Sequence, residues 1–541
     1  MDESSSKGNS FLPARFGRVF QPELLLVLAA LIIFHIFNTT FQKLQEASIW
    51  YVCFAPLIAL TMCVLAPGPR AADVIKPLRI ITCVVAVLLA VYLALAPITY
   101  PAGISATSDW ALLTVKVSVA GAIFGAISTF WRPAFVILPA AVLMQQKAVA
   151  AILFDTSISQ TDYIPIQEMA LFTGAGLMLM GGGIMARLGP VSRMIKRCDL
   201  EWAMVLIFMA AVGAHFSNYF YSGLQKVSLD GGPWLWVLEN PTHILTANAW
   251  LGGFFPLGAW RDVSAQTLQY LEIFVPLLNI VTLLGQLCAV IFVVRRVTMI
   301  GITLFYDLTH ITIFLISGIF FWKWIILNAA LVAAMKYLKP DAERPTAVIL
   351  AAIMVLGAPE IFHIARLGWY DTPALTRTEI VAVTKDGQAH IVPANYFGTI
   401  SVSAAQHRLG RPAEGHFPTV TWGTTQSGRV LQEAREGCSF GMDEEWRYPQ
   451  DASKIVRLIE RTHAYALQKA GEGGLYRYDF YPHHIWSNPF MFQDFAHVAP
   501  SQIDTYLYRT ISSCITLSGG VPEETRTLVD EIEITVTTKA K

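Results

Sequence analysis

Long apolar blocks separated by short polar segments fill most of the first 362 residues. A helix needs about 20 mostly apolar residues to cross the hydrocarbon of a bilayer. The blocks predict eleven spans: Leu24–Phe37, Ile49–Leu65, Ile80–Ile98, Ala111–Phe130, Pro133–Phe154, Met169–Ala186, Trp202–Tyr221, Leu271–Val294, Met299–Phe320, Trp324–Met335 and Ala347–Phe362. The first and tenth blocks are short, so either is a re-entrant segment or a span with wider limits. We therefore expect a polytopic α-helical membrane bundle of about eleven spans.

The pattern changes near Trp369, where charged residues become as frequent as in soluble domains. Runs at Glu379–Val383, Ile503–Leu517 and Thr527–Val536 predict strands, and Ala452–Lys469 has helical spacing with its charges on one face. The chain thus divides into an N-terminal tail (1–20), a transmembrane domain (21–366) and a soluble β-rich or α+β domain (367–541).

Basic residues alternate between the two sides of the predicted bundle. With the N-terminus in the cytoplasm, 16 Lys and Arg fall on the cytoplasmic side and 4 on the outer side, outside the spans and before the C-terminal domain. Cytoplasmic loops carry this excess in membrane proteins. An odd number of spans then places the C-terminal domain outside the inner (plasma) membrane, in a periplasm if the host has one. A count wrong by one span would reverse this side.

Composition narrows the function classes. Only 14% of the 541 residues are charged, against about 25% in ordinary globular chains. The formal charge of zero provides no basic field for nucleic acid. No metal-ligand spacing occurs, and the histidines near His483 lie among aromatic residues typical of a core, so we expect no metal. Cys438 and Cys514 are either a disulfide, if the domain is outside, or two free thiols.

Ionisable residues within the spans are the strongest functional signal, because they are costly in lipid. Asp307 and His310 are three residues apart, so they share one face of the predicted helix, and Tyr306 directly precedes them. The two can pair, or face a cavity together, which suits proton transfer. Alternatively, they form an internal hydrogen bond that locks two helices together.

A polar stripe ends the seventh block. His215, Asn218, Tyr219, Ser222 and Lys226 recur on one helix face. The amine of Lys226 falls at the outer edge of the hydrocarbon, where snorkelling to the interface is the simpler expectation. If it is instead desolvated, it becomes a usable base.

The segment after the stripe is rich in Trp, Pro and Gly and predicts an interfacial segment rather than a crossing. Trp234 and Trp236 lie within it. Its aromatic side chains would provide walls for an amphipathic ring-shaped ligand.

Three motifs together resemble a known family. They are Tyr219–Lys226 (YFYSGLQK), Tyr270–Pro276 (YLEIFVP) and Phe305–His310 (FYDLTH) followed by FWKW at 321–324. In order and spacing they are similar to the horizontally transferred transmembrane domain family, which is related to the vitamin-K-dependent gamma-glutamyl carboxylases. The resemblance covers mainly residues 215–338, within a carboxylase-like core of about 200–338.

The resemblance implies a function. In the carboxylases the lysine of the first motif, here Lys226, activates a reduced quinone, which reacts with O2 and yields a base that prepares glutamate for CO2. His310 matches a membrane histidine of the family. The implied cofactor is a reduced quinone of the vitamin K hydroquinone type, bound by His215, Tyr219, Trp234, Trp236 and Tyr306. Gln225 stands where the family commonly has a second lysine, which leaves the substrate open.

Two function classes follow. The first is a membrane enzyme with Lys226 as base, Asp307 and His310 as a second proton-handling pair, and a protein or small molecule as substrate, with a protein or peptide bound at the outer domain. The second is a non-catalytic assembly factor or transporter whose outer domain binds a partner. The sequence shows no repeat between its two halves, although many transporters have one.

Overall fold

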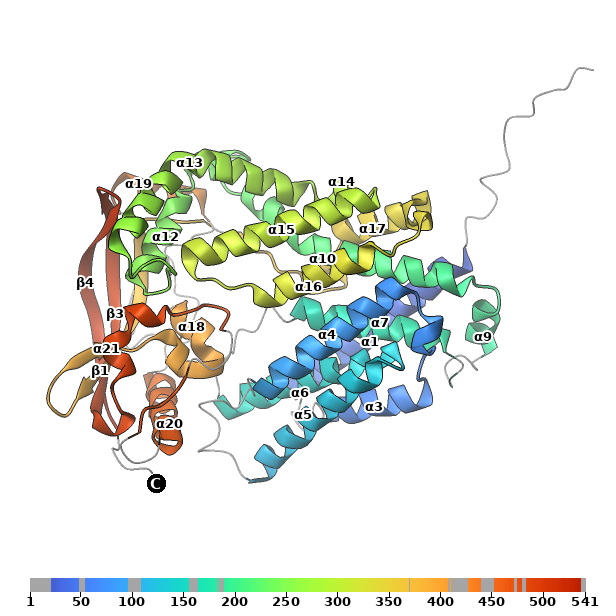
Figure 1. Ribbon diagram of the computed structural model, residues 1–541, viewed down its shortest axis with the longest axis horizontal. Coiled ribbons are helices and arrows are strands. Elements are labelled where there is room, and N and C mark those ends of the chain that lie inside the picture. The colour runs from blue at the N-terminus through green and yellow to red at the C-terminus, as the bar shows by residue number, and fades with distance from the viewer. Residues whose placement is uncertain are drawn as a thin grey trace, which may run out of the picture.

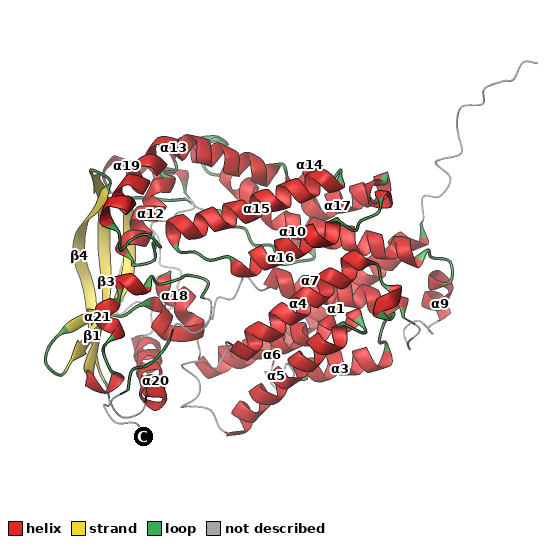
Figure 2. Cartoon of the chain, viewed as in Figure 1, coloured by secondary structure: helices red, strands yellow, loops and turns green. Residues whose placement is uncertain are grey.

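The structure is a computed structural model that describes residues 21–47, 54–95, 109–154, 164–181, 183, 189–368, 370–406, 409, 427–438, 452–470, 474–478 and 483–536. A helical bundle meets a small antiparallel sheet at one end (Figure 1). Figure 2 shows that the strands gather in this one domain, while the rest of the described chain consists of helices and the loops between them.

The first part of the bundle consists of helices that pack along one another. They are α1 (Pro22–Ala47), α3 (Ala55–Leu65), α4 (Lys76–Leu95), α5 (Asp109–Thr129), α6 (Ile137–Phe154), α7 (Ile164–Met180) and the short α9 (Gly189–Ile195). Small residues let these helices approach closely. Gly174 of α7, for example, faces Ile137 of α6 with no space for a side chain of its own.

The second part is built around α10 (Leu200–Val227), which is buried over most of its length. Its first turn is capped by Asp199, whose carboxylate accepts from the backbone N–H groups of Glu201 and Trp202 at 3.0 and 3.2 Å. The elements around it are α11 (Leu235–Glu239), α12 (Thr242–Leu251), α13 (Arg261–Leu287), α14 (Ala289–Phe292), α15 (Arg296–Ser317), α16 (Trp322–Met335) and α17 (Pro345–Gly357).

Five of the described helices are long and apolar enough to cross a membrane. They are Pro22–Phe41, Lys76–Leu95, Leu200–Val227, Arg261–Leu287 and Arg296–Ser317. The expected number of about eleven is not supported. Three other apolar blocks form the described helical stretches Ala55–Leu65, Trp322–Met335 and Pro345–Glu360, which are shorter than the length that a span requires. Exposed leucine and isoleucine side chains on α13 and α15 are consistent with a membrane location.

Described basic segments that the sequence assigns to one side, around 295–296 and 336–344, lie at the end of the bundle away from the sheet, near α14 and α17 (Figure 1). Arg296 donates to the carbonyl of Leu338 at 3.0 Å. Lys339 pairs with Glu201 at 2.5 Å, and the guanidinium of Arg344 lies 5.0 Å from the ring centroid of Trp202. Basic residues that are far apart in the sequence thus meet at one end of the bundle.

The C-terminal domain is an α+β unit, as expected. Its strands β1 (Ala374–Thr384), β2 (Ala389–Ile391), β3 (Ile503–Ser518) and β4 (Val521–Thr535) form an antiparallel sheet in the order β2-β1-β3-β4. The described helices are α18 (Ser401–Ala405), α19 (Gly428–Gly437), α20 (Ala452–Ala470) and α21 (Gln493–Ala496). Gly519 and Gly520, both with positive φ, form the two-residue turn between β3 and β4.

Backbone hydrogen bonds join the sheet domain to the bundle. The N–H of Phe320 donates to the carbonyl of His484 at 2.6 Å, and the N–H of Trp486 donates to the carbonyl of Gly318 at 2.9 Å. Gly318 has a φ of 70° and lies against the backbone of Phe254, so a side chain there would be strained and would clash. The end of α15 is therefore fixed to the domain.

A disulfide joins Cys438, after α19, to Cys514 of β3, with Cα atoms 5.8 Å apart. This decides between the two alternatives that the sequence left open for these residues. The described cysteines of the helical part, by contrast, are free thiols.

We expect removal of this disulfide by Cys438→Ser to destabilise the domain by about 4 kcal/mol, because the bond closes a long loop in the unfolded chain. Thermal unfolding of the purified protein measures the loss. The variants Cys514→Ser and Cys438→Ser/Cys514→Ser should unfold at the same temperature as Cys438→Ser. Alkylation of Cys438 in denatured but unreduced protein would contradict the prediction.

Candidate functional site

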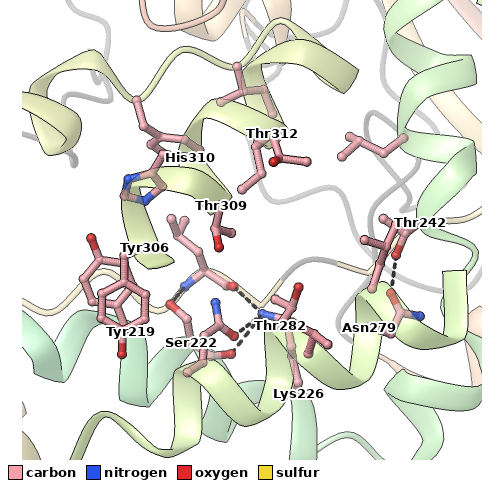
Figure 3. Close-up of a pocket in the computed structure, with 18 of the residues that line it drawn as sticks. Tyr219, Ser222, Lys226, Thr242, Asn279, Thr282, Tyr306, Thr309, His310 and Thr312 are labelled. Carbon is pink, nitrogen blue, oxygen red and sulfur yellow. Dashed lines mark hydrogen bonds between the residues drawn. The ribbon is translucent and has the colours of Figure 1, made fainter. Parts of the chain in front are cut away.

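A cavity of about 310 Å³ lies between α10, α13, α15 and the segment that leads to the sheet. Its walls are mostly apolar, with a few polar groups that point inward. Figure 3 shows the rings of Tyr219 and Tyr306 at one end, Thr242 and Asn279 at the other, and Lys226 between them. This combination of apolar walls and few polar groups is typical of small-molecule sites.

Lys226 is buried at the cavity wall, with 2% of its surface exposed. Its ammonium donates to the carbonyl of Ser222 at 3.1 Å, to Oε1 of Gln286 at 3.1 Å and to the carbonyl of Leu367 at 3.2 Å. It also lies 5.0 Å from the ring centroid of Trp236. The expectation that this amine snorkels is wrong, because the segment after α17 folds over it and supplies an acceptor.

The polar stripe of α10 binds that segment, residues 361–371. The N–H of Ala365 donates to Oδ1 of Asn218 at 2.8 Å, and the N–H of Leu367 donates to Oγ of Ser222 at 3.0 Å. One turn further along α10, Lys226 donates to the carbonyl of Leu367 in the same segment. Each residue thus satisfies a backbone group that would otherwise be buried without a partner.

Asp371 closes the same end of the cavity and is fully buried. Its N–H donates to Oδ1 of Asn240 at 2.7 Å, and its carboxylate lies close enough to Lys226 to act on it electrostatically. Thr242 and Asn279 continue this polar wall through a hydrogen bond of 2.5 Å. The sequence analysis missed Asp371, which stands alone after the last apolar block.

Aromatic rings form the opposite end of the cavity. Tyr219 of α10 and Tyr306 of α15 stack with centroids 3.6 Å apart and planes at 6°. The ring of His310 lies one turn further along α15, 4.9 Å from that of Phe321. A flat ligand would therefore find flat surfaces here.

Asp307 and His310 do not pair directly in the described structure. Asn328 of α16 binds the carboxylate instead: its Nδ2 donates to Asp307 at 2.9 Å and to the hydroxyl of Tyr219 at 3.0 Å. Its Oδ1 accepts from Nε2 of His215 at 2.7 Å. Asp307 is thus turned toward α16, and Nδ1 of His310 has no hydrogen-bond partner among the described residues. Sequence reasoning missed Asn328, a single polar residue in an apolar helix.

The structure brings together most of the predicted site. The five predicted residues that line the cavity are Lys226, His310, Tyr219, Trp236 and Tyr306. Asp307 and His215 lie behind the wall and reach it through Asn328. Trp234 does not line the cavity: it precedes α11 and is 55% exposed, because the helical turn directs it away from Trp236.

In the C-terminal domain, His483 is held by hydrogen bonds within the protein. His483 is buried between Oγ of Ser401 at 2.9 Å and the carbonyl of Tyr478 at 3.2 Å. Its burial lowers its pKa to about 4, so the ring is neutral. In the described part of the chain no three His, Cys, Asp or Glu side chains gather as a metal site.

The chain matches no protein-family model, no curated protein and no solved structure. The chemistry of the site is therefore argued from its own geometry. That geometry combines a buried amine, a buried carboxylate and stacked aromatic rings around one cavity.

We expect Asn328→Leu to lower the free energy of unfolding by about 2–4 kcal/mol. The substitution keeps a similar side-chain volume but removes the hydrogen bonds of Asn328 to Asp307, Tyr219 and His215. The loss arises because the buried His215 and Tyr219 keep polar atoms without a partner. Thermal unfolding in detergent measures it. Leu327→Ile, at the neighbouring buried position, is the control and should cost about 1 kcal/mol. Equal stability of the two variants would show that the network contributes nothing.

Proposed function

We propose that this chain is a membrane-embedded enzyme that binds a reduced quinone in the cavity and uses Lys226 as its base. The observation that carries the proposal is the buried Lys226 amine at the wall of an aromatic cavity. Its three hydrogen-bond acceptors are neutral oxygens of Ser222, Gln286 and Leu367. In its neutral form the amine donates only two of these hydrogen bonds, and its lone pair can then take the proton of a ligand hydroxyl.

The residues present fit a quinol. The cavity volume of about 310 Å³ is at the lower end of ligand sites. Stacked tyrosine rings provide a flat surface at one end, while Lys226 and Asp371 provide a proton acceptor and a charge farther along the wall. A bound reduced quinone would supply the electrons for reaction with O2. With CO2 as a second co-substrate, the overall reaction would be a carboxylation.

The opening of the cavity supports a lipid-soluble ligand. Leu308 and Val281 line the cavity and are also 63% and 44% exposed on the outer faces of α15 and α13. A shallow apolar groove that includes Phe274 and Leu277 adjoins it, and both share Leu278. A ligand dissolved in the bilayer could therefore enter sideways between these two helices.

The protein groups have separate tasks in this proposal. Lys226 accepts a proton from the ligand, and Asp371 balances its charge. Tyr219 and Tyr306 orient the ring by stacking. His310 faces the cavity as a second proton-handling group, while Asp307 acts on Tyr219 only through Asn328. The walls exclude water from the reacting atoms.

The same proposal includes an orientation in the inner (plasma) membrane, with the N-terminus in the cytoplasm and the sheet domain outside, in a periplasm if the host has one. Two observations support it. The basic segments lie at the end away from the sheet, and the disulfide of the sheet domain is typical of an oxidising compartment. The outer domain would then hold a protein or peptide substrate near the cavity.

We expect Lys226→Met to reduce quinol oxidation by about a hundredfold or more, the usual effect of losing a general base, while folding is retained. Oxygen consumption by purified protein in nanodiscs with a short-chain naphthoquinol measures this. Lys116→Met, an exposed lysine on α5 away from the cavity, is the matched control and should keep wild-type activity.

Lys226→Arg separates the base from the structural role of this residue. Its guanidinium can still donate to Leu367, but it does not act as a base. Wild-type activity in Lys226→Arg or Lys226→Met would refute the catalytic role. If no quinone co-purifies and the outer domain binds one partner protein regardless of Lys226, the chain is instead an assembly factor.

We expect a membrane-impermeant maleimide to label Ser518→Cys in intact cells, because this exposed residue ends β3 in the outer domain. Lys336→Cys, exposed at the opposite end of the bundle, should be labelled only after the cells are permeabilised. The unmodified chain controls for its own cysteines. The reverse labelling pattern would invert the orientation.

A further inference from the structure

A buried carboxylate lies outside the cavity, where α7 meets α1 and the start of the segment 361–371. Glu168 is fully buried. Its Oε1 accepts from Nδ2 of Asn38 at 2.8 Å and from Nδ1 of His363 at 2.6 Å, and its Oε2 accepts from the N–H of His363 at 2.7 Å. None of these residues was singled out by the sequence, and the reaction proposed above does not use them.

His363 connects this carboxylate to the surface, because half of its side chain (52%) is exposed. The hydrogen bond to Glu168 raises the pKa of the imidazole, although partial burial and the nearby Lys147 oppose the change. Lys147 itself donates to Oε1 of Gln167 at 3.5 Å. Glu168 and His363 thus form a pair that can take a proton from the solution as imidazolium beside carboxylate.

His215 lies on the other side of this carboxylate, below the cavity wall. The amide of Asn328 must present its Nδ2 to Asp307, so its Oδ1 faces His215 and accepts the Nε2 proton. In the neutral ring, Nδ1 therefore carries a lone pair. This atom is buried and has no hydrogen-bond partner among the described residues, so it needs a donor.

A small chamber of about 10 Å³ lies between the two groups. Its lining includes Glu168, Ala214, His215, Asn218 and His363. This volume is about what one buried water molecule requires, and polar groups on two sides supply its hydrogen bonds. A donor placed here can serve Nδ1 of His215 and a carboxylate oxygen of Glu168 together.

We propose that one water molecule bound in this chamber links Glu168 to Nδ1 of His215, and that His363, Glu168 and this water form the route by which a proton on His215 exchanges with the outer solution. The route is a property of the fold. Its use in turnover rests on the function proposed above.

Each step of the route conserves protons. Protonated His215 gives its Nδ1 proton to the water, which passes one of its own protons to Glu168. The Glu168–His363 pair then holds one more proton and releases one from the exposed ring nitrogen of His363. His215 returns to its neutral state, with Nε2 still bound to Asn328. Asp307, which is bound to Asn328, and His310, which lines the cavity, are other ionisable groups near His215 and take no part in these steps.

Nitrogen-15 solid-state NMR of histidine-labelled full-length protein in nanodiscs, without added quinone, tests the route. The measured quantity is the exchange rate of the His215 ring protons with water. We expect Glu168→Gln and Ala214→Val, which fills the chamber without changing any charge, each to slow this exchange by about tenfold or more. Ala214→Gly leaves the chamber open and is the matched control, with exchange at the wild-type rate.

The outcomes separate the two proposals. If Glu168→Gln does not fold, Ala214→Val alone decides. Wild-type exchange in Ala214→Val would refute the route, as would equal slowing in Ala214→Gly. Bound quinone is quantified in the same samples. Slowed exchange in a protein that never binds quinone would retain the route and remove the proposed function, whereas quinone binding with unchanged exchange would do the opposite.

Discussion

The backbone of residues 361–368 leaves the bundle along α10, and several of its polar groups find partners on that helix. The polar stripe of α10 supplies them, with Asn218, Ser222 and Lys226 binding Ala365 and Leu367 in successive turns. This constraint places the ammonium of Lys226 inside the protein rather than at the membrane interface. It also brings Asp371 to the cavity and sets the point from which β1 begins. The proposed base and the attachment of the sheet domain thus depend on the same series of hydrogen bonds.

The sequence predicted the elements whose signal is local. The strong apolar blocks correspond to α1, α4, α10, α13 and α15. The strand and helix patterns of the C-terminal domain correspond to β1, β3, β4 and α20. The predicted number of spans is not supported, because hydrophobicity alone does not distinguish a helix that crosses the membrane from a shorter buried helix. Trp324–Met335 is as apolar as a span, yet α16 has 14 residues and packs against α15 and α4. Its length is set by its neighbours rather than by a bilayer.

The candidate site was predicted only in part, for the same physical reason. Tyr219 and Lys226 share a face of one helix, and Tyr306 and His310 share a face of another, so spacing brought them together in advance. Asn328, Gln286 and Asp371 come singly from three other segments, and no local spacing marks a residue whose partners lie on other elements. Asn328 also positions Asp307, because its amide binds the carboxylate that was expected either to pair with His310 or to face a cavity with it. Snorkelling was the simpler expectation for Lys226 until the fold showed what covers it.

The glycine at the end of α15 has a mechanical consequence. Because Gly318 lies against Phe254 and its carbonyl accepts from Trp486, the sheet domain is bonded to the end of α15, which contributes to the cavity wall. A molecule held by the sheet would stay at a constant distance from the cavity, since no hinge separates the two at this joint. Delivery of a large substrate would then require the substrate to slide or thread along the domain, rather than the domain to swing toward the membrane.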